Sequence, residues 1–190
     1  MKAMTWEDYF EPSSGGKGPR YQYKDTSVKT LPANLPMPPT DRRITFSNCH
    51  DLVDISALSE WDTSGITNMD CMFNHCYSLQ DISPLKQWET KNVTNMEYMF
   101  NCCRKLDDIS SLYDWDISNV TKMQFIFNGC HELPKEIRSE VHDPQTFSVM
   151  MDKYVTPVLY PVADYPEYEE EECIFEDDTI DSLSMTIVRK

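Results

Sequence analysis

The chain has 190 residues, a formal net charge of −15 and an apolar content of 40%. This length suits one structural domain with flanking segments, and no apolar run of about 18 residues predicts a membrane span. The excess of acidic residues repels phosphate backbones, so binding of nucleic acid through the repeated part of the chain is not expected.

Residues 1–43 are expected to form an N-terminal extended arm that also caps the segment after it. A glycine-rich stretch at 15–19 and prolines near its end are loop signals. Trp6, Tyr9 and Phe10 are too apolar for a solvated tail, so we expect the arm to dock on this chain or on another one. Its first residues lack the apolar region of a signal peptide, and secretion by such a signal is not expected.

Residues 44–133 repeat with a period of 27. A fixed period of roughly 20 to 50 residues indicates stacked supersecondary units, which bury their apolar faces mainly against their neighbours. We expect the recurring apolar side chains to fill the core between the units. These side chains are Trp61, Trp88 and Trp115; Phe46, Phe73, Phe100 and Phe127; Met69, Met96 and Met123; and Cys49, Cys76, Cys103 and Cys130.

The first part of each unit places apolar residues three positions apart, as in Leu79, Ile82, Leu85 and Trp88. The stretch is too short and too interrupted for a long helix. Its central Asp-Ile-Ser suits a brief strand with the isoleucine facing inward and its two neighbours facing outward, because strand side chains alternate.

The second part of each unit has the spacing of one helical face. Thr94 followed by Glu97 forms a capping box that predicts the helix start. Asparagines at equivalent positions predict the helix end, because asparagine tolerates the left-handed conformation. The apolar face carries Val93, Met96, Met99, Phe100 and Cys103, and the terminating asparagines are Asn74, Asn101 and Asn128.

These residues resemble the BspA-like leucine-rich repeats. The pattern W-[DE]-x-x-x-[VI]-T-x-M-x-x-[MI]-F-x-x-C-x-x-L-x-D-I matches at 61–82 and 88–109, and partially at 46–55 and 115–133. The resemblance implies an α/β repeat, a short leucine-rich-repeat solenoid of about four rungs with extended arms. Such repeats are found in bacterial surface adhesins, in protists and in large DNA viruses. The family has no known catalytic residues, so the resemblance implies none here.

The C-terminal part departs from the repeat. Residues 134–153 are expected to form a C-terminal cap, and residues 154–190 an extended acidic tail. The segment 164–181 holds 10 acids and no base around Ile174 and Phe175. Such a block is either solvated and disordered or an acidic arm that docks on a basic partner through Ile174 and Phe175.

The first candidate site is a column of carboxylates, each two residues before a serine. Like charges at a repeat spacing of about 5 Å repel one another. They therefore need bonds to loop amides and the nearby serines, a basic ligand, or a metal ion. The column consists of Asp54, Asp81 and Asp108 with Ser56, Ser83 and Ser110.

The cysteine and tryptophan columns are the other candidates. One cysteine per unit favours stacked core thiols over a zinc site, whose ligands usually lie two to four residues apart, or over a disulfide between units. The phase that the tryptophans share with leucine and isoleucine favours the core over an exposed platform for carbohydrate or peptide. The odd count of 7 cysteines indicates a reducing compartment.

No phosphate-binding loop, zinc-protease or serine-hydrolase motif is present. We therefore expect a non-enzymatic protein with no cofactor and no metal, acting in the cytoplasm or within a virion. Its expected partners are other proteins, as an architectural subunit of a large assembly such as a large DNA virus capsid. A regulatory adaptor that uses the acidic tail and an adhesin-like surface binder are the alternatives.

Overall fold

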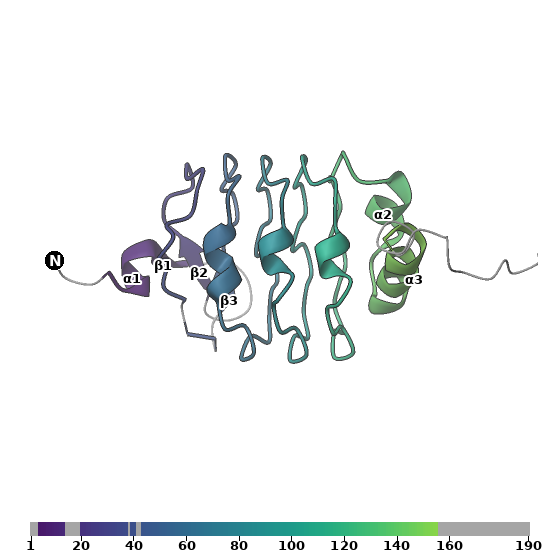
Figure 1. Cartoon of the computed structure of the whole chain (residues 1–190), viewed down its shortest axis with the longest axis horizontal. Coiled ribbons are helices and arrows are strands. Elements are labelled where there is room, and N and C mark those ends of the chain that lie inside the picture. The colour runs from purple at the N-terminus through teal and green to yellow at the C-terminus, as the bar shows by residue number, and fades with distance from the viewer. Residues whose placement is uncertain (1–3, 14–19, 38, 41–42, 156–190) are drawn as a thin grey trace, which may run out of the picture.

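A computed structural model describes residues 4–13, 20–37, 39–40 and 43–155. Successive 27-residue passages of the chain lie side by side along the long axis of the molecule (Figure 1). We call each passage a rung and name it by its phenylalanine. The rungs are those of Phe46, Phe73, Phe100 and Phe127.

The regular elements are short and lie mostly at the two ends (Figure 1). At the N-terminal end, β1 pairs antiparallel with β2, and β2 pairs parallel with β3. At the C-terminal end two α-helices follow one another. The bounds are α1 Trp6–Tyr9, β1 Phe10–Ser13, β2 Arg20–Tyr23, β3 Arg43–Thr45, the 3-10 helices η1 Ser56–Glu60, η2 Ser83–Leu85 and η3 Ser110–Leu112, then α2 Lys135–Glu140 and α3 Pro144–Tyr154.

The conformations predicted for the two parts of each unit, a strand and then a helix, are wrong. Where Asp81-Ile82-Ser83 suggested a strand, Ile82 directly precedes the 3-10 helix η2. Where a helix was predicted from Val93 to Cys103, the chain forms overlapping turns, and the described residues 43–133 contain no α-helix. Burial at these positions requires only that the side chains face inward, which a run of turns satisfies as well as a helix does.

Alternate amides of this segment are donated to the next rung, and amides between them, such as Met99 N and Asn101 N, close turns within the rung. In the Phe100 region every second residue donates its N–H to a carbonyl 26 positions later, and parallel bridges join Asn68 to Asn95 and Asn95 to Lys122. The inter-rung ladder, as we name these bonds, therefore replaces helical bonding. Its members include Met96 N to Lys122 O (2.8 Å), Tyr98 N to Gln124 O (3.0 Å), Phe100 N to Ile126 O (3.0 Å) and Cys102 N to Asn128 O (2.7 Å).

The asparagines predicted to end helices serve another purpose. None of Asn74, Asn101 and Asn128 has a positive φ; the left-handed residues lie beside them, for example His75, Cys102 and Gly129. The asparagine side chains form a ladder across the rungs. Asn101 Nδ2 donates to Asn74 Oδ1 at 2.8 Å, and Asn128 Nδ2 donates to Asn101 Oδ1 at 2.8 Å.

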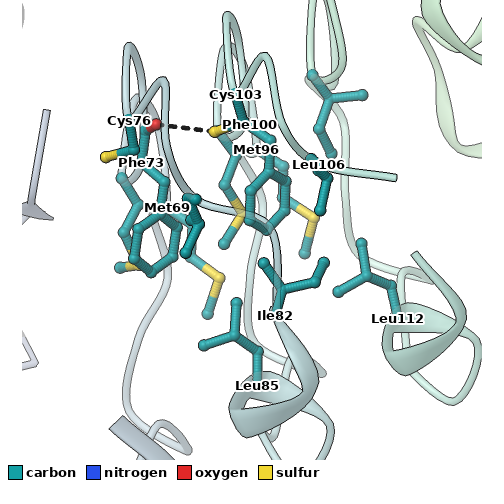
Figure 2. Close-up of a cluster of buried hydrophobic side chains, with 14 of the residues drawn as sticks. Met69, Phe73, Cys76, Ile82, Leu85, Met96, Phe100, Cys103, Leu106 and Leu112 are labelled. Carbon is teal, nitrogen blue, oxygen red and sulfur yellow. Dashed lines mark hydrogen bonds between the residues drawn. The ribbon is translucent and has the colours of Figure 1, made fainter. Parts of the chain in front are cut away.

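The core consists of aligned columns of identical side chains (Figure 2). Phe73 and Phe100 stack nearly parallel with centroids 5.6 Å apart, and Phe100 and Phe127 follow at 5.9 Å. A second column consists of methionines with no exposed surface, Met69, Met96 and Met123. Aligned rings of this kind add attraction beyond the burial of their area.

Aromatic side chains from the flanks cover both ends of these columns. At the N-terminal end Phe10 of β1 and Tyr23 of β2 contact Phe46, at 5.7 and 5.4 Å between centroids. At the C-terminal end Phe147 of α3 stacks on Phe127 at 6.3 Å. The phenylalanine column therefore ends in protein contacts at both ends.

Two arginines tie the N-terminal sheet to the first rung. Arg43 on β3 pairs with Asp70, and Arg20 on β2 reaches the same carboxylate with Nη2 3.4 Å from Oδ2. The side chains are largely buried, which makes this ion pair costly to break. The repetition of rungs supports a short solenoid, and we retain that fold class as a proposal.

Phe100→Ala is expected to lower the free energy of unfolding by about 3–5 kcal/mol, because a fully buried ring between two stacked neighbours is lost. Urea denaturation followed by circular dichroism measures the change. Val53→Ala, at a side chain that is 52% exposed, serves as the control and should change stability by less than about 0.5 kcal/mol. Equal stability of Phe100→Ala and wild type would show that this ring does not support the core.

Asn101→Asp is expected to destabilise the protein at neutral pH by about 1–3 kcal/mol, because a carboxylate cannot donate to Asn74 Oδ1. Burial raises the pKa of the introduced carboxyl above its unfolded value, so the penalty grows as pH rises and disappears below the unfolded pKa of about 3.9.

Urea denaturation at a series of pH values tests this dependence on Asn101. Asn119→Asp, which makes the same change at an exposed position, is the control. A loss of stability that is equal in the two variants at every pH would contradict a structural role for the asparagine ladder.

Candidate functional site

The carboxylates of the predicted site are held by local hydrogen bonds. Each Oδ1 accepts the backbone N–H of the serine two residues later, a geometry in which aspartate stabilises a turn. The turn leads directly into a 3-10 helix, and the intervening isoleucine is buried. The three bonds are Ser56 N to Asp54 (2.9 Å), Ser83 N to Asp81 (2.8 Å) and Ser110 N to Asp108 (2.7 Å).

The bonds to Ser56 favour the charged form of Asp54. The backbone N–H of Ser56, followed by its hydroxyl, lowers the pKa of Asp54. At Asp108 the second carboxylate oxygen, Oδ2, also accepts the hydroxyl of Ser110 at 2.9 Å. The serines predicted beside the carboxylates are therefore their bonding partners.

Two of the three carboxylates share a groove of about 260 Å³. Asp81 and Asp108 line it together with Asp107, whose Oδ2 accepts Gln80 Nε2 at 2.7 Å. Asp54 lies outside it; its backbone bridges Thr30 of the N-terminal arm. We call this feature the acidic groove, lined by Gln80, Asp81, Ile82, Ser83, Asp107, Asp108, Ser110 and Ser111.

The acidic groove has no basic side chain in its lining. Within the described part of the chain, no group of three or more His, Cys, Asp or Glu side chains has the arrangement of a metal site. Asp107 was not among the predicted site residues. The sequence could have indicated Asp107 in two ways. It directly precedes Asp108, and it stands 27 residues after Gln80, at the equivalent position of the preceding rung.

The cysteine column lies inside the core and bonds between rungs. Cys76 Sγ donates to Phe46 O at 3.3 Å, and Cys103 Sγ to Phe73 O at 3.2 Å, the bond drawn in Figure 2. Burial raises the pKa of Cys130 to about 12 and those of Cys76 and Cys103 well above the ordinary value. The six cysteines in the described ranges are free thiols.

The tryptophan column is also internal. Trp88 Nε1 donates to Leu58 O at 2.9 Å, and Trp115 Nε1 to Leu85 O at 3.1 Å. Trp61, Trp88 and Trp115 are each at most 7% exposed. Their indole N–H groups and faces are therefore occupied within the protein, and they form no platform for a ligand.

Two exposed aromatic residues were missed by the sequence reasoning. Tyr98 and Phe125 stack at 5.0 Å and are 37% and 51% exposed. The sequence could have indicated them, because two aromatic residues stand 27 residues apart and each directly precedes a buried residue of the predicted helical face. Ile174 and Phe175, the predicted anchors of the tail, lie outside the described residues.

The described helices are all too short or too polar to cross a membrane. This finding agrees with the expectation that the sequence contains no membrane span. It does not identify a partner.

The comparison with protein families identifies the chain. Residues 40–155 match the model of the family described as Mycoplasma protein of unknown function, DUF285, and the chain belongs to that family. The resemblance to BspA-like leucine-rich repeats is thereby corrected, since no leucine-rich-repeat family matched. The structure agrees with this correction, because the ladder joins the Met-Phe segments and not the Asp-Ile-Ser segments. No curated protein and no solved structure matches the chain.

Iodoacetamide at pH 8 is expected to alkylate the partly exposed Cys102 while Cys76, Cys103 and Cys130 stay protected in the folded protein. Only the thiolate reacts, and the buried thiols remain protonated at this pH. Peptide mass spectrometry measures each rate, with the urea-unfolded protein as the control. Alkylation of Cys103 at equal rates in folded and unfolded protein would contradict its place in the core.

Proposed function

We propose that this member of the DUF285 family is a non-enzymatic protein-binding component that receives a basic segment of a partner protein in its acidic groove. The observation that carries the proposal is the meeting of Asp81, Asp107 and Asp108 around one groove without a basic side chain in its lining.

The geometry of the groove favours a cationic peptide over a free small cation. The three carboxylates are already held by Ser83, Ser110 and Gln80. Their side chains therefore lose little conformational entropy when a ligand binds. They lie along an open surface and are not gathered around a point, as ligands of Ca²⁺ or Mg²⁺ would be. Lysine or arginine side chains spaced along a peptide suit such a row.

The charge of the surrounding surface supports the same class of partner. Residues 44–133 hold 13 acids against 5 bases. Such a surface attracts a basic protein over a distance of about a Debye length, roughly 10 Å at moderate salt, and repels nucleic acid. We propose no cofactor and no catalytic role, and we propose a reducing compartment, which free thiols favour.

Several more specific expectations are not carried forward. The capsid subunit and the adhesin both depended on the corrected resemblance to BspA-like repeats. The regulatory adaptor depended on residues 154–190, of which only Tyr154 and Val155 are described. The proposal therefore names the chemistry of the partner and not the assembly to which it belongs.

Replacing Asp81, Asp107 and Asp108 by Asn is expected to weaken binding of a synthetic peptide of alternating lysine and glycine about tenfold. Three surface ion pairs of roughly 0.5 kcal/mol each account for that factor. Isothermal titration calorimetry at low salt measures the affinity. Asparagine preserves the turns, because its side-chain oxygen accepts the same backbone N–H.

The matched control replaces Asp62, Glu89 and Asp116 by Asn, Gln and Asn. These residues form another exposed column with the same period, and their replacement removes the same charge. The affinity should stay within about twofold of wild type, because exposed charges outside the acidic groove are screened by solvent and salt. An equal decrease of affinity in both triple variants would show that net charge, and not the acidic groove, binds the peptide.

A further inference from the structure

A second surface, at the C-terminal end of the rungs, has the opposite chemistry. Tyr98 and Phe125 stack on one another there and remain partly exposed. Both have a positive φ, 56° and 61°. Cys71, one repeat before Tyr98, has the same conformation with a φ of 59°, so the left-handed backbone belongs to the repeat. The aromatic pair is therefore an exposed apolar surface at a repeated backbone position.

Phe125 also lines a groove of about 360 Å³ between the last rung and α2. Its lining residues are Gln124, Phe125, Asn128, Arg138, Ser139, Val141 and His142. Arg138 and His142 are the titratable residues in this lining, and no acid is among them. We call this feature the basic groove.

Arg138 has an unused hydrogen-bond donor at this groove. Its Nε is buried and has no partner among the described residues. A buried N–H without a partner is destabilising, so an acceptor supplied from outside the described residues would be stabilising. A carboxylate is the acceptor that matches a guanidinium best, because it can accept two parallel hydrogen bonds.

We propose that the basic groove is the docking site of this chain's own acidic segment, residues 172–178, with Ile174 and Phe175 on the aromatic pair and the flanking carboxylates toward Arg138. The segment reads Glu-Cys-Ile-Phe-Glu-Asp-Asp, an apolar pair with acids on both sides. It complements a groove that is lined by Phe125, on which Tyr98 stacks, and by Arg138, with no acid in the lining.

The path of the chain permits this docking. Val155, the last described residue, lines a groove together with Asp107, Asp108 and Ile137, and Ile137 directly precedes Arg138 on α2. The chain thus leaves the described structure beside the helix that carries Arg138. The two carboxylates repel an acidic segment there, which favours a course toward the basic groove. Eighteen residues lie between Val155 and Ile174, which allows a reach of up to about 60 Å at roughly 3.3 Å per residue.

Two differences separate this proposal from binding of a partner at the acidic groove. The site is at another surface, and the occupant has the opposite charge. Docking within one chain also raises the effective concentration of the segment, to the millimolar range for a flexible linker, so modest contacts suffice. Either proposal can fail without the other.

A photo-cross-linking experiment on the full chain tests the proposal. Phe125→p-benzoylphenylalanine keeps an aromatic residue at the site and captures whatever covers it. Mass spectrometry is expected to locate the cross-link in residues 172–178. A mixture of ¹⁴N- and ¹⁵N-labelled protein identifies the source, and cross-linked species of pure isotope composition are expected because the segment comes from the same chain.

Variants of the segment test its recognition. Replacing Ile174 and Phe175 by Ser is expected to lower the cross-link yield roughly tenfold, as loss of an anchoring aromatic residue does, and Arg138→Gln is expected to lower it as well. The matched control replaces Leu183 and Ile187 by Ser, which removes apolar residues from another part of the tail. Val149→p-benzoylphenylalanine, at an exposed residue of α3, is expected to give no cross-link to residues 172–178.

Three results would overturn the proposal. The first is the absence of a cross-link from position 125 to the segment. The second is a cross-link of mixed isotope composition, which would make a second copy of the chain the occupant. The third is an equal decrease of yield in the Ile174/Phe175 and Leu183/Ile187 variants, which would show that the tail meets the groove without preference.

Discussion

The inter-rung ladder is the interaction on which the rest of this structure depends. Because alternate amides of one rung donate to carbonyls 26 positions later, each residue is held beside its equivalent in the next rung. An insertion of one residue would shift every later side chain out of its column. The constancy of the 27-residue period follows from this requirement, and so does the alignment of rings such as Phe73 on Phe100.

Alignment has different consequences for buried and exposed columns. In the core, buried polar groups need hydrogen-bond partners, and these groups have them in the neighbouring rung. The Asn101 side chain donates to Asn74, the Cys103 thiol to the carbonyl of Phe73, and the Trp88 indole to the carbonyl of Leu58. Each of these three donors thus avoids the cost of an unmade hydrogen bond. The core is thereby hydrogen-bonded across the rungs as well as packed.

Outside, alignment gathers like groups that the core does not need. At one edge it brings carboxylates of successive rungs around the acidic groove, where Asp81 and Asp108 stand in equivalent positions. At the C-terminal end it stacks Tyr98 on Phe125 beside Arg138. The two surfaces differ in charge and lie in different parts of the molecule, so the protein offers two separate opportunities for binding.

The sequence by itself determined the period and the residues that face inward, such as Phe100 and Met96, because hydrophobic spacing depends only on which positions must be buried. Only the tertiary structure decided the backbone conformation. A run of turns and a helix can bury the same apolar positions. The choice between them depends on whether the backbone amides donate within a rung or between rungs. The grouping of Asp107 with Asp81, and of Arg138 with Phe125, likewise required the fold, since these residues meet only when separate rungs and the C-terminal helices pack together.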